Sequence, residues 1–120
     1  LPYIHFYNTD VSPDINDGQS PLAMISHLAT AEDFVSLKID IDYTESEIPI
    51  FLDIMNNTNG VGELVDEFFF ELHYKAPELT NQWKIWEIPE YNHGIRMKRY
   101  NVMKLFQDLR LSGTRAHIWP

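Results

Sequence analysis

The feature that most constrains this 120-residue chain is a regular alternation of strand-like and helix-like segments. Four segments have the dense β-branched and aromatic content that is typical of strands. They are Tyr3–Tyr7, Phe34–Ile41, Leu64–Tyr74 and Arg115–Trp119. Helical patterns separate them, and this alternation predicts a parallel sheet whose right-handed crossovers place helices on its faces. We therefore expect an α/β fold with a Rossmann-like, mostly parallel sheet flanked by helices.

The first two predicted helices differ in how clearly they begin. The segment Pro21–Leu28 has apolar residues at helical spacing and a proline suited to the first helical position. The second helix contains Pro49, whose missing N–H is harmless only near the start of a helix. Thr44 and Glu47 have the spacing of a capping box, but a cap at Ser46 places Pro49 nearer the start of the helix. We therefore predict a helix that is capped by Ser46 and runs through Met55.

The third predicted helix carries an amphipathic repeat that ends at a glycine. Apolar residues at positions 102, 105, 106 and 109 follow the i, i+3, i+4, i+7 spacing, and Gly113 supplies the stop. A long polar connection, residues 75–98, precedes this helix and contains Trp83 and Trp86. Connections of this length are usually functional or disordered. A lid over a site and a surface loop pinned by its tryptophans are both open interpretations.

Charge and composition exclude several classes of function. The chain has 18 acidic and 9 basic residues, a formal net charge of -9, whereas binding to nucleic acid needs clustered Lys and Arg. No apolar run approaches the roughly 18 residues of a membrane span. The chain has no cysteine, which removes disulfides and thiol nucleophiles. We therefore expect no nucleic-acid partner and no membrane segment in this chain.

Ionisable side chains fall near the ends of the predicted strands. Asp40 and Asp42 share one face of their strand by the two-residue period. Glu71 and His73 repeat this spacing on the next strand, and His117 is near the end of the last one. Ligands of open parallel sheets bind outside the carboxyl ends of the strands, so strands in register would bring all five side chains to one edge. The alternative is that solvent, helix caps or salt bridges satisfy each group separately.

The strand that carries the two aspartates also carries a family resemblance. KIDIDYTESEI, Lys38–Ile48, resembles the K-[IV]-D-[VI]-E-G-x-E-x-E segment of FkbM-type methyltransferases, S-adenosylmethionine-dependent enzymes that mostly methylate oxygen. DEFFFELHY, Asp66–Tyr74, is similar to the strand that follows in the family, and FYNTDVS, Phe6–Ser12, to an Asn-x-x-x-Ser passage near the cofactor's adenine. Asp42 replaces the family's glutamate, and Tyr43 replaces its glycine.

The resemblance implies that residues 1–120 form a single, partial domain, the C-terminal part of a class I methyltransferase-like fold. The glycine-rich turn that holds the methionine part of S-adenosylmethionine in the family would lie upstream of Leu1. An upstream half-domain would therefore be required for strong cofactor binding. The acceptor implied is a small molecule or a glycan.

The resemblance also implies roles for individual residues. Asp40 and Asp42 would border the methyl-transfer centre. Asn8 and Asp10 would flank the adenine of the cofactor. One of two residues, Glu71 or His73, would orient or deprotonate the acceptor hydroxyl.

Two further hypotheses remain open. One is a hard divalent cation at this edge, because oxygen-rich sites suit Mg²⁺ or Mn²⁺. Its ligands would be Asp40, Asp42, Glu71 and His73. This metal hypothesis is compatible with methyl transfer. The other hypothesis is a non-catalytic interaction module that acts through residues 75–98 and an exposed sheet edge.

Overall fold

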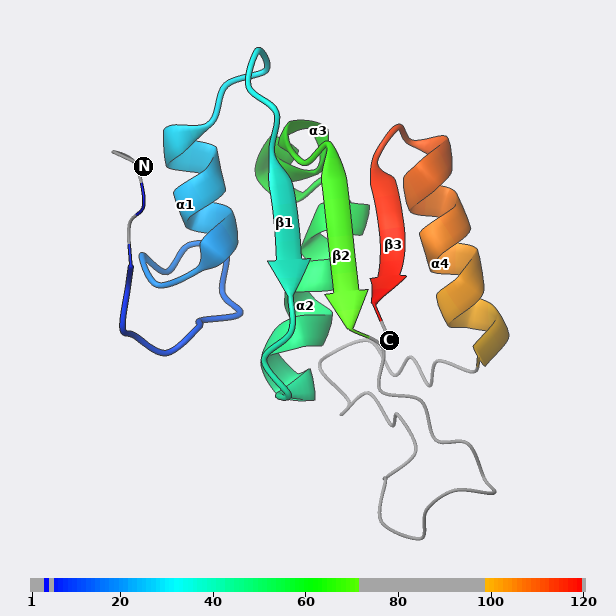
Figure 1. The fold of residues 1–120 in the computed structure, drawn as a ribbon, viewed down its shortest axis with the longest axis horizontal. Coiled ribbons are helices and arrows are strands. Elements are labelled where there is room, and N and C mark those ends of the chain that lie inside the picture. The colour runs from blue at the N-terminus through cyan, green and yellow to red at the C-terminus, as the bar shows by residue number, and fades with distance from the viewer. Residues whose placement is uncertain (1–3, 5, 72–98, 120) are drawn as a thin grey trace, which may run out of the picture.

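The computed structural model describes residues 4, 6–71 and 99–119, which form a three-stranded sheet with helices packed behind it (Figure 1). In chain order the elements are α1 (Pro21–Leu28), β1 (Ser36–Ile39), α2 (Thr44–Met55), the 3-10 helix η1 (Thr58–Gly60), α3 (Val61–Leu64), β2 (Glu67–Glu71), α4 (Arg99–Leu111) and β3 (Arg115–Trp119). The strand order in the sheet is β1-β2-β3. The predicted α/β class is confirmed.

All three strands run in the same direction, as the alternating pattern predicts. Glu67 at the start of β2 lies between Ser36 of β1 and Arg115 of β3. At the other end Glu71 pairs with Trp119. The strands therefore begin level with one another and end at a common edge. This carboxyl edge is where parallel sheets bind ligands.

Alternate strand residues build the side of the sheet that faces the helices. Phe68 and Phe70 of β2 are 0% and 1% exposed, and their ring centroids lie 5.7 and 5.1 Å from that of Phe51 in α2. Phe106 of α4 lies 5.5 Å from Phe51. Burial of each such ring contributes about 1.5–3 kcal/mol to stability. The phenylalanines of β2 thus hold α2 and α4 against the same face.

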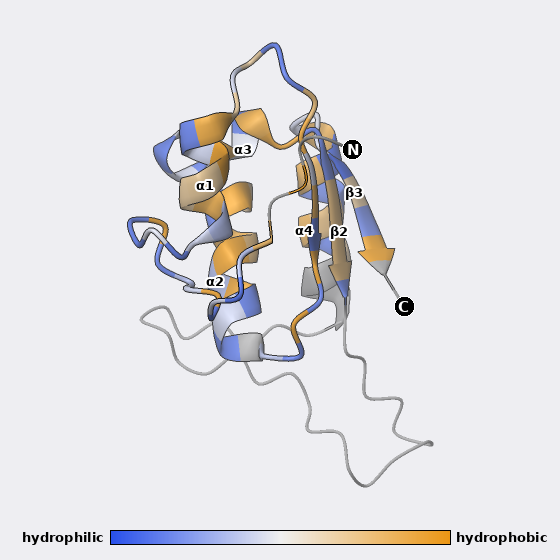
Figure 2. Cartoon of the chain, turned by 60° about the vertical axis from the view of Figure 1, so that its left-hand side comes forward, coloured by the Kyte–Doolittle hydropathy of each residue, from blue (hydrophilic) through white to orange (hydrophobic). Residues whose placement is uncertain are grey.

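The opposite face of the sheet carries no helix from the described part of the chain. Figure 2 shows α1, α2 and α3 on one side of the strands. Alternation along the strands directs a second set of residues to the other side, and none of them is buried: Ser36, Lys38, Glu67, Phe69, Arg115 and His117. Flanking helices are therefore confirmed, but among the described residues they cover only one face.

The start of α2 differs from the prediction. The helix begins at Thr44, with Tyr43 as its N-cap and Pro49 inside it. The Tyr43 carbonyl accepts hydrogen bonds from the N–H groups of Ser46 and Glu47. Ser46 is therefore a residue of the first turn, and its prediction as the cap is wrong. Because Ser46 and Glu47 are 4% and 0% exposed, we attribute the earlier start to packing of this turn, which outweighs the bond that the proline cannot make.

The predicted stop of the last helix is confirmed in detail. The Gly113 N–H donates to the Arg110 carbonyl and the Thr114 N–H to the Leu109 carbonyl, which is the bond pair of a Schellman motif. Gly113 has φ 112, a backbone conformation that glycine adopts without steric cost. The chain therefore leaves α4 sharply and enters β3 directly.

The connection from α2 to β2 was not predicted to be helical, yet it contains η1 and α3. Asn57 and Asn59 have left-handed backbone with φ 52 and 53, which short amide side chains tolerate. Gly62 packs against the end of α2, and a Cβ there would lie 2.4 Å from the Ile54 carbonyl oxygen. Glycine at this position therefore allows α3 to pack against α2.

The predicted strand Tyr3–Tyr7 does not form in the described residues. Ile4, Phe6 and Tyr7 have no strand pairing, and their side chains are 76%, 87% and 57% exposed. Sequence alternation specifies extended backbone, but a strand also requires a neighbouring edge to pair with. The strand β1 begins two residues later and ends two residues earlier than predicted, and β2 begins at Glu67 because Leu64 belongs to α3. The end of the second prediction, residues 72–74, lies outside the described residues.

Candidate functional site

Three carboxyl groups meet at the carboxyl edge of the sheet. Asp40 directly follows β1, Asp42 lies two residues further on, and Glu71 ends β2. Carboxyl oxygens from these three residues, called the acidic cluster below, lie within 4.8 Å of one another. Because β1 and β2 are parallel, they bring groups that are distant in sequence to the same place. The predicted convergence is confirmed for these three residues.

A lysine offsets part of the negative charge of the cluster. Lys38 projects from the same strand face as Asp40 and forms an ion pair with its carboxyl group. The two side chains are 44% and 33% exposed, so water screens the pair and its contribution to stability is below about 1 kcal/mol. Three carboxyl groups close to one ammonium group leave a local field that favours cations.

The turn between β1 and α2 places Asp42 in an uncommon conformation. Asp42 has φ 54, the left-handed region that aspartate tolerates better than most residues. Tyr43 has φ -133, which is ordinary extended backbone. The family resemblance puts glycine at position 43, but the backbone there does not require one. The residue of this turn whose backbone would suit glycine is Asp42, because its φ is positive.

A buried glutamate lies behind the same turn. Glu47 is 0% exposed, and its Oε1 accepts a hydrogen bond of 3.0 Å from the N–H of Ile41. Ile41 stands between the two aspartates of the cluster. The sequence identified Glu47 as the capping-box partner of Thr44 and as a match to the family segment, but neither pattern predicts its contact with Ile41. The signal was the glutamate three residues after a threonine.

The predicted adenine-binding residues lie on a segment that packs against the start of α2. Asn8 and Asp10 are both exposed and belong to no regular element. The neighbouring Val11 packs against the core, and its carbonyl accepts a 3.5 Å hydrogen bond from the Ser46 hydroxyl. This contact ties the segment to the turn of α2 that follows the acidic cluster. The polar side chains of Asn8 and Asp10 remain accessible to a ligand.

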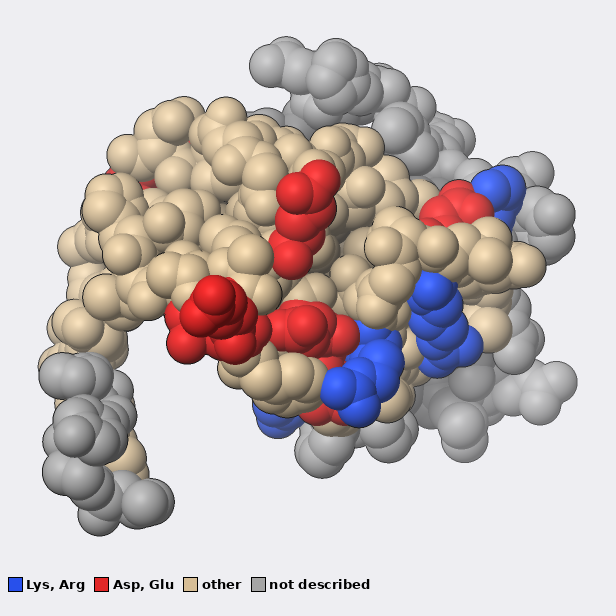
Figure 3. All heavy atoms as spheres, turned by 90° about the horizontal axis from the view of Figure 1, so that it is seen from above, with Lys and Arg blue, Asp and Glu red and all other residues tan. Residues whose placement is uncertain are grey.

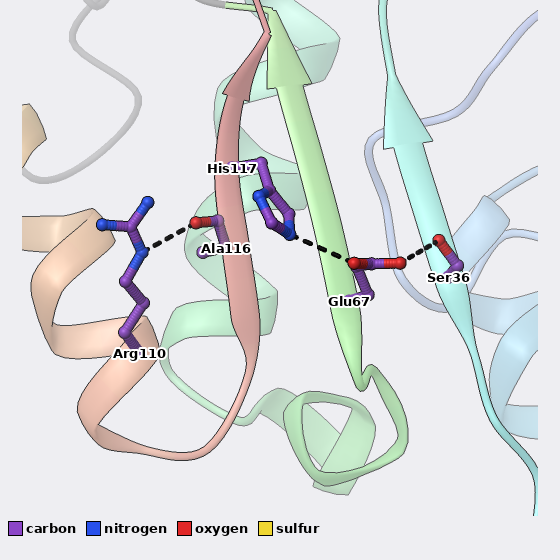
Figure 4. Close-up of polar contacts among 5 residues, drawn as sticks. All are labelled: Ser36, Glu67, Arg110, Ala116 and His117. Carbon is purple, nitrogen blue, oxygen red and sulfur yellow. Dashed lines mark hydrogen bonds and ion pairs between the residues drawn. The ribbon is translucent and has the colours of Figure 1, made fainter.

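The prediction that His117 joins the acidic cluster is wrong. His117 pairs in register with Phe69, in the middle of β2, and the two rings stack with centroids 4.6 Å apart. Its Nε2 lies 3.1 Å from Oε1 of Glu67, at the start of β2, and Glu67 also accepts a 3.3 Å hydrogen bond from the Ser36 hydroxyl (Figure 4). The side chain therefore turns toward the amino end of the sheet and forms a separate polar network.

Two other predictions fall outside the described residues. They concern His73, the fourth member of the predicted strand-end group, and the connection of residues 75–98 with its tryptophans. Their contribution to the site stays a prediction.

Two other surfaces of the described chain do not contain the predicted site residues. A hollow of about 340 Å³ lies beside α4 and β3 and is lined by Met103, Lys104, Phe106, Gln107, Arg110 and Ile118. Figure 3 looks onto the end of the molecule where the strands begin, and acidic and basic side chains lie next to one another there. Neither surface brings together three carboxyl groups as the carboxyl edge does.

Comparisons with known protein families, curated proteins and solved structures found no match for this chain. Within the described ranges, no helix is both long enough and apolar enough to cross a membrane.

Proposed function

We propose that this chain forms the C-terminal part of an S-adenosylmethionine-dependent O-methyltransferase of FkbM type. The observation that carries the proposal is the meeting of Asp40, Asp42 and Glu71 at the carboxyl edge of a parallel sheet. Two of these residues lie within the KIDIDYTESEI segment that carries the family resemblance. The third ends the neighbouring strand, which the resemblance also includes.

The charge of the acidic cluster suits the proposed chemistry. S-adenosylmethionine, when bound, supplies a methyl group on a positively charged sulfur atom. Carboxyl oxygens near that region would attract the cationic sulfur and so favour binding of the cofactor over binding of its product, whose sulfur is neutral. Asp40 and Asp42 would border the transfer centre in this arrangement.

Glu71 has the position required of a general base in the proposed reaction. It ends the strand next to the two aspartates, so an acceptor hydroxyl placed at this edge would be within its reach. One carboxyl oxygen of Glu71 would take the hydroxyl proton as the acceptor oxygen bonds to the methyl carbon and the carbon–sulfur bond breaks. General base catalysis of this kind contributes roughly a factor of 100 to 10,000, and His73 is the alternative base.

The segment of Asn8 and Asp10 is the proposed site for one end of the cofactor. Asn8 and Asp10 are exposed, and the Val11 contact with Ser46 holds their segment beside the first turn of α2. An amide and a carboxyl group can hydrogen-bond the edge of an adenine ring. We propose that the methionine end is held by an upstream half-domain.

Calorimetric titration tests the cofactor assignment. The longest natural form of the protein should bind S-adenosylmethionine and S-adenosylhomocysteine with a measurable heat, and Asp42→Asn should weaken the first ligand more than the second. Absence of binding to both ligands at millimolar concentration would overturn the proposal.

A matched pair of variants on β2 tests the role of Glu71. Glu71→Gln should lower the rate of methyl transfer by roughly 100-fold or more. Glu67→Gln removes a carboxyl group at the other end of the same strand and should leave the rate within about twofold. Equal rates for the two variants would remove Glu71 as the base.

A divalent cation at the acidic cluster is the second candidate function. The three carboxyl oxygens span at most 4.8 Å, and ligand oxygens on opposite sides of a cation lie about 4 Å apart around Mg²⁺ and about 5 Å apart around Ca²⁺. Small side-chain rotations would therefore suffice for a shared ion. Manganese-soaked crystals should show an anomalous peak between the three residues. An empty edge at millimolar Mn²⁺ contradicts this candidate without affecting the cofactor titration.

A further inference from the structure

We infer that Glu47 is the positioning residue of the acidic cluster. Its buried carboxyl group holds the backbone turn that brings Asp40 and Asp42 close to Glu71. The inference rests on the proposed function of the cluster, and it assigns a role to a residue that neither touches the proposed ligand nor belongs to the cluster.

The contact joins the middle of the turn to the interior of the protein. Glu47 is 0% exposed, and its Oε1 accepts the Ile41 N–H at 3.0 Å. Ile41 is the single residue between the two aspartates. A hydrogen bond to its amide therefore fixes the backbone that carries both carboxyl groups of the turn.

Side-chain packing anchors this turn only weakly. Ile41 is 37% exposed and Tyr43 is 57% exposed, and both aspartates are exposed as well. The left-handed conformation of Asp42, with φ 54, is sparsely populated unless the surrounding structure holds it. The bond from Ile41 to Glu47 is an anchor of this kind, because it connects an exposed turn to a fully buried group.

The position of Glu47 within α2 explains how a carboxyl group can be buried there. It is one of two acidic residues in the first turn of the helix, the other being Glu45, and helix N-termini favour negative charge. Glu45 is exposed, so the dipole alone does not require burial. Burying a polar group costs free energy unless it is hydrogen-bonded, which Glu47 is through Ile41. Its placement therefore matches a role in the turn rather than a role in starting the helix.

The neighbouring residue links the same helical turn to the proposed cofactor segment. Ser46 is 4% exposed, and its hydroxyl donates to the Val11 carbonyl. The first turn of α2 thus contacts two segments at once, the acidic turn through Glu47 and the segment of Asn8 and Asp10 through Val11. Displacing this turn would disturb both parts of the proposed site together.

Three variants of the longest natural form test the inference. Glu47→Gln keeps an acceptor oxygen for the Ile41 amide, whereas Glu47→Leu fills a similar volume without an acceptor. Glu45→Leu is the matched control, since it removes an exposed carboxyl group from the same turn. Each variant is measured for Mn²⁺ affinity by electron paramagnetic resonance, for S-adenosylhomocysteine affinity by calorimetry, and for amide hydrogen exchange at Ile41, at a temperature where thermal unfolding shows it to be folded.

The expected results distinguish positioning from a purely structural role. For each probe that the wild type binds, folded Glu47→Leu should show an affinity that is roughly 10 to 100 times weaker, the usual effect of removing a group that orients a ligand residue. Its Ile41 amide should also exchange faster than that of the wild type. Glu47→Gln should keep both the probe affinity and the Ile41 exchange rate within a few-fold of the wild-type values. Glu45→Leu should change the affinity by less than about twofold.

Several outcomes would overturn the inference. The first is wild-type affinity in folded Glu47→Leu. The second is a loss of binding in Glu47→Gln as large as that in Glu47→Leu, and the third is an unprotected Ile41 amide in the wild type. If the wild type binds neither probe, the proposed function fails separately. Amide exchange at Ile41 is then the only test of whether Glu47 positions the turn. The inference is supported if the Ile41 amide loses protection in Glu47→Leu and keeps it in Glu47→Gln. Equal exchange in the two variants contradicts it.

Discussion

The two faces of the sheet are stabilised by different interactions. On the face covered by helices, Phe70 packs against Phe51 and Phe106, with ring centroids 5.1 and 6.4 Å away. On the open face, Glu67 lies 3.1 Å from the His117 ring. The first set of contacts is apolar and excluded from water, whereas the second is polar and partly hydrated.

This difference separates the part of the chain that stabilises the fold from the part available for recognition. Apolar burial contributes in proportion to the area removed from water, while partly exposed ion pairs contribute little. Parallel sheets are nearly always covered on both faces, and the open face carries Phe69 stacked on His117. The open face is therefore the one available for recognition.

The largest difference between the faces should appear on truncation of neighbouring phenylalanines. Phe70 is 1% exposed, so Phe70→Ala removes ring contacts with both α2 and α4 and leaves a cavity. We expect a loss of about 3–5 kcal/mol in the free energy of unfolding, measured by urea denaturation.

Phe69→Ala is the control for this comparison, because it alters the adjacent residue on the opposite face. Phe69 is only partly buried, and its described ring partner is His117. The expected loss is about 1 kcal/mol, the scale of a single aromatic contact. Equal losses for the two variants would mean that both faces are buried in solution, and the comparison would fail.

The fold was predictable from the sequence where the local pattern and the packing agree. The segment Pro21–Leu28 became α1 with the predicted bounds, and Arg115–Trp119 became β3. The prediction failed at the start of α2, where the cost of Pro49 argued for a later cap at Ser46. Burial of that turn is a tertiary effect, and no local pattern contains it.

The candidate site divides in the same way. Parallel strands and a two-residue period were sufficient to predict that Asp40, Asp42 and Glu71 meet. They were insufficient for His117, because the direction of a ring depends on its register partner Phe69 and on the carboxyl group of Glu67. Strand order alone specifies neither contact.

The polar network of the open face should have a smaller effect than the phenylalanines. The side chains of His117 and Glu67 are 43% and 22% exposed, so water and salt screen their interaction. A double-mutant cycle of Glu67→Ala and His117→Ala should give a coupling energy of about 0.5 kcal/mol, and 1 M NaCl should reduce it. A coupling above about 2 kcal/mol would show that the open face is desolvated.

The smallest effect is expected from a turn that belongs to neither face. Asp33 lies between α1 and β1, and its carboxyl group accepts hydrogen bonds from the Thr30 N–H and the Thr30 hydroxyl. These bonds, the backbone one first, lower the pKa of Asp33 below its ordinary value. Because the folded-state pKa is the lower one, the stabilisation is complete above the unfolded-state pKa of about 4. It is lost as the pH falls through the folded-state pKa.

Thermal unfolding of Asp33→Asn across this pH range tests the sign of that effect. The variant should melt slightly below the wild type at pH 6, and the two melting temperatures should converge as the pH falls through the folded-state pKa, because the wild-type carboxyl group then becomes protonated as well. Thr30→Ala keeps the backbone N–H and removes only the hydroxyl donor, so it should reduce the pH dependence without abolishing it. A gap that widens on acidification would contradict the direction of the shift, and a gap as large as that of Phe70→Ala would contradict the assignment of stability to the helix-covered face.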